Sequence, residues 1–112
     1  MNLKTTIFVA VLCLGTGHAL AGGDLAAGEK KAKEVCAACH GDAGAKPTTP
    51  DYPVLAGQHE DYLKHSLMAY KSGKRKNAIM AGMATPLSKK EIADLAAYFA
   101  AQKSALGVKY YH

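Results

Sequence analysis

Two cysteines and a histidine stand together in this sequence, as Cys36-Ala37-Ala38-Cys39-His40. Thiols at this spacing can form thioether bonds with the two vinyl groups of one porphyrin. An imidazole directly after the second cysteine is then held beneath the iron, where it can act as an axial ligand. C-x-x-C-H is the attachment pattern of a c-type haem. The sequence therefore predicts one haem c, bound covalently through Cys36 and Cys39, with His40 on the iron.

The same residue types also occur in two other kinds of site. Paired cysteines in an exported protein often form a disulfide. A C-x-x-C pair with a histidine can bind zinc, but only with a fourth ligand at suitable spacing. Neither His59 nor His65 has such a spacing, and we expect both at the surface or at a helix end. The histidine directly after Cys39 favours haem attachment over both alternatives.

Methionines downstream of this motif could complete the iron coordination. Thioether sulfur is a soft, neutral donor that favours ferrous iron and raises the reduction potential. Met68 falls in a predicted helix, where we expect it in the core. Met80 and Met83 fall in residues 77–86, which we predict to be a loop that folds over the haem. Ligand chemistry suits these two equally, and either would leave no open position on the iron for a substrate.

Three amphipathic helices are predicted around these residues. The first spans 24–38, with Asp24 as N-cap. The second spans 58–71 and ends at Gly73, and the third spans 89–102 after a capping box of Ser88 and Glu91. The predicted apolar stripes are Leu25, Ala26, Ala32, Val35 and Ala38 in the first helix, and Ile92, Leu95, Ala96 and Phe99 in the third. Nothing predicts a strand, so the expected fold class is all-α.

A loop rich in glycine and proline, residues 41–53, follows the haem motif. Its prolines would fix backbone carbonyls near the histidine. One of these, which we expect to be that of Pro53, can accept the free ring N–H of His40 and so set its tautomer.

Residues 1–21 have the features of a signal peptide: Lys4, an apolar run over 7–14, and Ala19-Leu20-Ala21 before the cleavage point. We predict export to the periplasm and a mature domain of residues 22–112, with a short tail at 103–112. The apolar run is too short to span a bilayer. The residue before Cys13 is not small, so we do not expect a lipid anchor, and we expect no membrane span after cleavage.

The net charge is +5, with the charged residues interspersed along the chain. Nucleic-acid binding would need a denser basic patch and is not expected. A domain of this size has a small core, and a covalent haem would supply a large apolar plate for side chains to pack against. We expect a monomer.

Together these motifs resemble those of class I cytochromes c, and most closely one domain of the bacterial cytochrome c4 family. The resemblance covers almost all of residues 22–112. It implies the class I cytochrome c fold, with three or more helices wrapped around a covalently attached haem. The matching segments are Cys36-Ala-Ala-Cys-His40-Gly41, Tyr52-Pro53-Val54-Leu55-Ala56-Gly57-Gln58, Tyr62-Leu63, Met80-Ala-Gly-Met83, Pro86-Leu87-Ser88 and Leu95-Ala-Ala-Tyr98-Phe99.

The resemblance also implies residue roles. It favours Met80 over Met83 as the sixth ligand. It places Gly28 and Ala32 of the first helix across Leu95 and Tyr98 of the last, and a glycine without Cβ allows such a close approach. Family members usually carry two such domains and two haems, whereas this sequence has one haem motif. We therefore expect no electron transfer between haems within the chain.

The predicted function is that of a soluble periplasmic electron-transfer protein, not an enzyme. Lysines, including a basic run at 71–76, would steer it to redox partners with acidic docking surfaces. One alternative is a haem-bearing subunit docked to a periplasmic dehydrogenase or oxidase, for which only the tail 103–112 gives a hint. A peroxidase or gas-binding protein is another, and would need an open iron site with a distal acid–base group.

Overall fold

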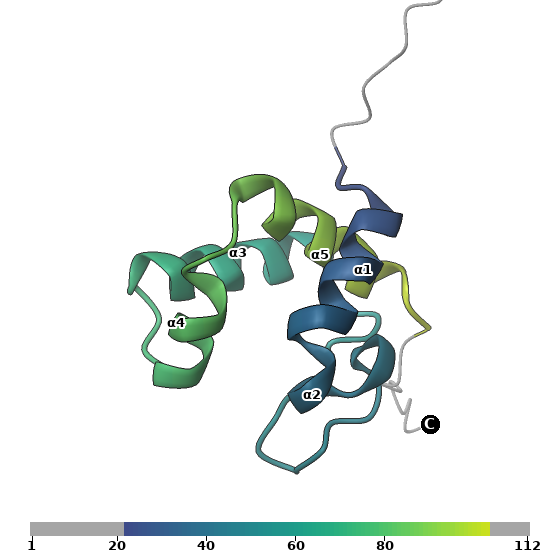
Figure 1. The fold of residues 1–112 in the computed structure, drawn as a ribbon, viewed down its shortest axis with the longest axis horizontal. Coiled ribbons are helices and arrows are strands. Elements are labelled where there is room, and N and C mark those ends of the chain that lie inside the picture. The colour runs from purple at the N-terminus through teal and green to yellow at the C-terminus, as the bar shows by residue number, and fades with distance from the viewer. Residues whose placement is uncertain (1–21, 104–112) are drawn as a thin grey trace, which may run out of the picture.

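The computed structural model describes residues 22–103, and within them the regular secondary structure is all helix, joined by loops (Figure 1). The predicted all-α class is confirmed. The predicted signal peptide and residues 104–112 of the tail lie outside the described residues. No helix in the described part has the length and apolar character needed to cross a membrane.

The elements are α1 (Leu25–Val35), α2 (Ala37–His40), a short 3-10 turn η1 (Asp42–Gly44), α3 (Glu60–Ser72), α4 (Ala78–Ala84) and α5 (Lys89–Ala101).

Helix α1 begins as predicted, but its end and its buried face differ from the prediction. Asp24 is the N-cap as predicted, and its carboxylate accepts the N–H of Ala27 at 3.0 Å. The helix ends at Val35, and α2 follows as a separate short helix, so the single predicted helix over 24–38 is wrong. The predicted stripe is also wrong except at Ala32, because Leu25, Ala26, Val35 and Ala38 are exposed. The buried residues of α1 are Gly28 and Ala32, since α5 crosses the helix on its small-residue face.

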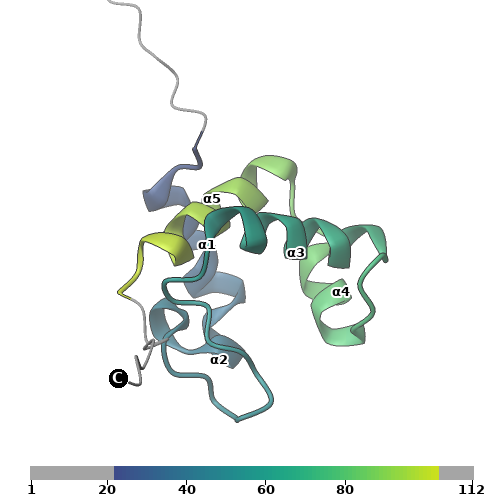
Figure 2. The same ribbon diagram turned by 180° about the vertical axis from the view of Figure 1, so that it is seen from behind.

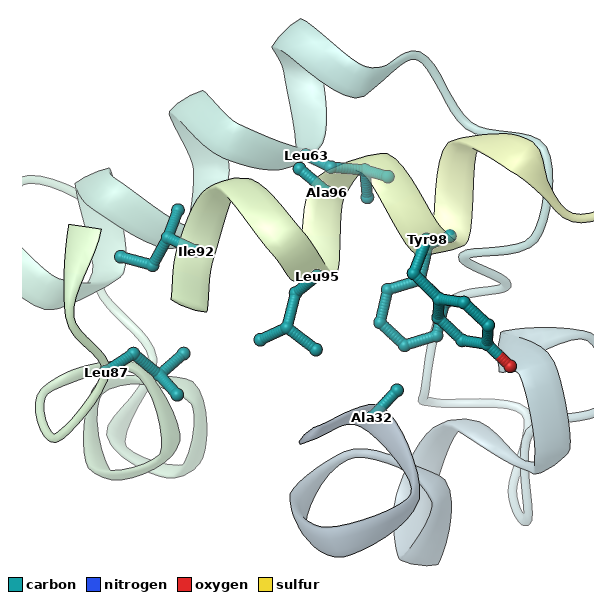
Figure 3. Packing of buried hydrophobic residues seen from close by; sticks show 8 residues of the cluster. Ala32, Leu63, Leu87, Ile92, Leu95, Ala96 and Tyr98 are labelled. Carbon is teal, nitrogen blue, oxygen red and sulfur yellow. The ribbon is translucent and has the colours of Figure 1, made fainter. Parts of the chain in front are cut away.

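The crossing of α1 and α5 requires a glycine. A Cβ on Gly28 would lie 2.1 Å from the carbonyl oxygen of Asp94 and 2.8 Å from the Cβ of Tyr98. Figure 3 shows Ala32 of α1 pointing toward Leu95 and Tyr98 of α5. The crossing implied by the family resemblance is therefore confirmed.

Helix α5 supplies most of the core (Figure 3). Its capping box is present: Ser88 Oγ accepts the N–H of Glu91 at 3.1 Å, and Glu91 Oε2 accepts the N–H of Ser88 at 2.8 Å. The predicted stripe of this helix is confirmed, since all four of its residues are buried. The core cluster consists of Ala32, Leu63, Leu87, Ile92, Leu95, Ala96, Tyr98 and Phe99.

A buried carboxylate joins the start of α1 to α5. Asp94 Oδ1 accepts the backbone N–H of Asp24 at 2.7 Å, and Oδ2 accepts Lys90 Nζ at 2.7 Å. Burial acts to raise the pKa of the Asp94 carboxyl, but the hydrogen bonds from Lys90 and Asp24 outweigh it and lower the pKa. Asp94 is therefore held as a carboxylate in the folded protein.

Helix α3 packs along α5, and α4 packs against α3 (Figure 2). Gly73 ends α3 in the left-handed conformation, with φ of 76°, as its position predicted. The loop predicted over residues 77–86 is wrong, because residues 78–84 form helix α4. Asn77 caps this helix, and its one glycine, Gly82, costs only about 1 kcal/mol relative to alanine, which the cap can offset.

Candidate haem site

The two cysteines lie one helical turn apart at the start of α2. The carbonyl of Cys36 accepts the N–H of Cys39 at 3.2 Å and the N–H of His40 at 3.0 Å. Side chains three positions apart on a helix lie on neighbouring positions of one face, so both thiols can reach one flat ligand. Both are half-buried free thiols. Burial, with a smaller effect of Cys39, raises the pKa of the Cys36 thiol to about 11, so the free thiol is protonated at neutral pH.

His40 is buried and its ring is oriented by the loop that follows it. Its Nδ1 lies 2.9 Å from the carbonyl oxygen of Pro53. A carbonyl can only accept, so Nδ1 carries the proton and donates it, which leaves Nε2 as the nitrogen with a free lone pair. The Pro53 carbonyl predicted from the sequence is therefore confirmed as the acceptor. The ring of Tyr52, whose centroid is 6.1 Å from that of His40, packs beside it and was not anticipated.

Local hydrogen bonds fold residues 41–53 back onto the motif. The backbone N–H and the hydroxyl of Thr48 both donate to the carbonyl of Cys39, at 3.0 and 3.2 Å. Gly41 has φ of 79°, and a Cβ there would lie 1.9 Å from the carbonyl oxygen of Lys46. Only glycine fits this turn, because both the conformation and the close backbone contact exclude a side chain. The turn is what brings Pro53 to His40.

The candidate methionines lie on two different helices. Met68 is half-buried on α3 and packs against the core, as predicted. Met80 and Met83 lie on α4, where Met80 is half-buried and Met83 is 48% exposed. Both α4 and the haem-motif helix α2 lie below α3 and α5 in Figure 1. The helix that carries Met80 and Met83 thus lies on the same side of the α3–α5 pair as α2.

The N-cap of α4 was missed at the sequence level. Asn77 Oδ1 accepts the backbone N–H of Met80 at 2.9 Å. An asparagine directly before an apolar run is a helix-start signal that could have identified it.

His59 and His65 are exposed, as expected. Within residues 22–103, no three His, Cys, Asp or Glu side chains are grouped to hold a metal ion.

Positive charge is concentrated on one stretch of the chain. No Asp or Glu occurs between Asp61 and Glu91. Within this stretch Lys74, Arg75 and Lys76 are exposed, as predicted for a basic run. The guanidinium of Arg75 is held in place by three side chains of α3: the hydroxyls of Tyr62 at 3.5 Å and Ser66 at 3.2 Å, and the ring of Tyr70 at 4.8 Å. The turn between α3 and α4 therefore presents an ordered, cationic surface.

A family model and the similar proteins all indicate the cytochrome c family. The family model described as cytochrome c matches residues 25–103. Cytochrome c4 of Pseudomonas aeruginosa is 50% identical over 99 residues, which are 88% of this chain and 48% of that protein. Cytochrome c-554(548) of Halomonas halodenitrificans is 48% identical over 84 residues, which are 72% of this chain and 99% of that protein.

A solved structure agrees with the sequence comparisons. Reduced recombinant cytochrome c4 from Pseudomonas stutzeri superposes with a TM-score of 0.68 at 41% identity, over 76% of this chain and 48% of that chain. The chain thus spans about half the length of the cytochrome c4 proteins that it matches.

Proposed function

We propose that this chain, which belongs to the cytochrome c family, is a soluble electron-transfer protein of the periplasm. It has the class I cytochrome c fold, and its cofactor is haem c. The bound haem supplies an iron that takes up and releases one electron. The observation that carries the proposal is the hydrogen bond between His40 Nδ1 and the Pro53 carbonyl, next to the two thiols.

The residues of the site fit this cofactor. Cys36 and Cys39 lie one helical turn apart. Their thiols can therefore each form a thioether with the same porphyrin, which would lie against one face of α2. His40 is buried, with one ring nitrogen bound to Pro53 and the other left to bind iron. The hydrogen bond to Pro53 fixes the tautomer and increases the basicity of Nε2, which strengthens a bond to the metal.

We assign the sixth position to Met80. The assignment is supported by the spacing of Met80 in the family pattern and by its smaller exposure relative to Met83. A methionine on the iron leaves no open position for a substrate, so the domain exchanges electrons and does not transform molecules. His59 and His65 are exposed and are not candidates for the distal acid–base group of a peroxidase.

Redox partners are proposed to dock through acidic surfaces. The support is the concentration of Lys and Arg between Asp61 and Glu91, with Arg75 ordered by its neighbours. Such a surface increases the rate of encounter with an acidic protein more than it increases affinity.

Spectroscopy of the haem-loaded protein tests the assignment. We expect the oxidised protein to be low-spin, with a methionine-to-iron charge-transfer band, and the reduced protein to titrate as a one-electron couple. Met80→Ala should abolish the band, and Met83→Ala should leave it intact. A high-spin spectrum of the unmodified protein would refute an electron-transfer role with His/Met coordination.

A further inference from the structure

Helix α4 has little apolar attachment to the rest of the polypeptide. Among its seven residues, Ala84 is the only one that is buried, and Ile79 is 53% exposed. Among the described helices it packs chiefly against α3. An isolated helix of this length is not stable in water. Polar contacts at the two ends of α4 therefore matter for its position.

The N-terminal end of α4 is held by Asn77. This residue has extended backbone angles, and its side-chain oxygen accepts the N–H of Met80 at 2.9 Å. The capping bond is thus made to the backbone of the proposed iron ligand itself. Loss of the cap would release the first turn of the helix, which is the turn that contains Met80.

The C-terminal end of α4 is held by a residue from α3. Lys71 Nζ donates to the carbonyl oxygen of Thr85, the C-cap residue, at 2.6 Å. The hydroxyl of Thr85 donates to the carbonyl of Ala81 at 2.6 Å. An ammonium group is favourable here because the last carbonyls of a helix carry partial negative charge. Within residues 22–103 Lys71 forms no ion pair, so this carbonyl is its polar contact.

We propose that Asn77 and Lys71 are positioning residues, which clamp the two ends of α4 and thereby keep Met80 on the iron. The proposal rests on the His/Met coordination proposed above. The clamp determines how often Met80 detaches, and hence how well the domain excludes other ligands. Neither residue is a proposed iron ligand, and each acts through its hydrogen bond to the backbone of α4 or its C-cap.

The binding of imidazole to the oxidised, haem-loaded protein measures this detachment, because imidazole can enter only when Met80 leaves. We expect Asn77→Ala to bind imidazole about fivefold faster than the unmodified protein, from the usual effect of a lost cap. Lys71→Met keeps the alkyl chain and removes the ammonium, and we expect about a threefold increase. Asn77→Asp retains a cap acceptor and should restore the original rate.

Two matched controls separate the clamp from general stability and charge. Ser88→Ala removes the equivalent cap of α5; it should lower the thermal unfolding temperature and leave the imidazole rate unchanged. Lys64→Met removes one exposed charge from α3 and should also leave the rate unchanged. Wild-type rates in Asn77→Ala and Lys71→Met would overturn the clamp, as would an equal acceleration in Ser88→Ala. A charge-transfer band that survives Met80→Ala would instead refute the ligand assignment, which distinguishes the two failures.

Discussion

Replacing Gly28 by alanine tests the packing of α1 on α5 directly. The added Cβ would lie 2.1 Å from the carbonyl oxygen and 2.7 Å from the carbonyl carbon of Asp94, and 2.8 Å from Tyr98 Cβ. Favourable contacts between carbon atoms lie at about 3.5–4.0 Å, so the two helices would have to separate by about 1 Å. A change of rotamer cannot relieve the clash, because two of the three atoms belong to the backbone.

The magnitude follows from two opposing effects. Alanine is a better helix former than glycine by about 1 kcal/mol. Overpacking a well-packed contact costs about 1–3 kcal/mol, and here it also displaces Leu95 and Tyr98 from the core. Since the clash is with backbone, we expect the upper end of this range and a net loss of about 2 kcal/mol in the free energy of unfolding. For a domain of this size the unfolding temperature should fall by about 10 °C.

Thermal unfolding of the haem-loaded protein, followed by far-ultraviolet circular dichroism, measures this loss. Gly82→Ala is the matched control: its Cβ would meet no atom within 4 Å, and Gly82 lies about 200° around α4 from Met80. This variant should be as stable as the unmodified protein or slightly more stable. A Gly28→Ala protein that unfolds at or above the original temperature would show that α1 and α5 do not meet at this position.

Two further predictions concern charge. Asp94→Asn should destabilise the protein by about 1–2 kcal/mol at neutral pH. The pKa of Asp94 is lower in the folded state than in the unfolded state. Its contribution to the free energy of unfolding is therefore complete above the unfolded-state pKa of about 3.9, and it is lost as the pH falls through the folded-state pKa. The difference between variant and unmodified protein should therefore shrink below about pH 4; a difference that persists in acid would contradict this role. The rate of electron transfer to an acidic redox protein should fall as salt is added, and Lys74→Met should weaken that dependence. A rate indifferent to ionic strength would argue against steering.

Features that depend on neighbouring residues were predictable from the sequence. The caps at Asp24, Ser88 and Gly73 use contacts within one turn of the helix, so residue type and spacing suffice to find them. The acceptor of the His40 ring could be expected because few residue types hold a carbonyl rigidly in a short loop, and Pro53 is one of them.

The buried face of α1 was not predictable from its own pattern. Hydropathy favours burial of Leu25 and Val35, yet the helix buries Gly28 and Ala32. The large apolar side chains in this contact belong to α5. The backbone of α5 can approach α1 only at positions where α1 has small residues. Which face is buried is thus a property of the pair of helices, and only the family resemblance supplied the partner.

The two proposed iron ligands are held by different means, and this predicts where the site opens. His40 follows Cys39 directly in α2, and its ring is also bonded to the Pro53 carbonyl. Met80 lies on a helix too short to be stable alone, which is held at its ends by Asn77 and Lys71. Detachment of a ligand should therefore begin at Met80, and substitutions in α3 and α4 should alter the coordination before those around Pro53 do.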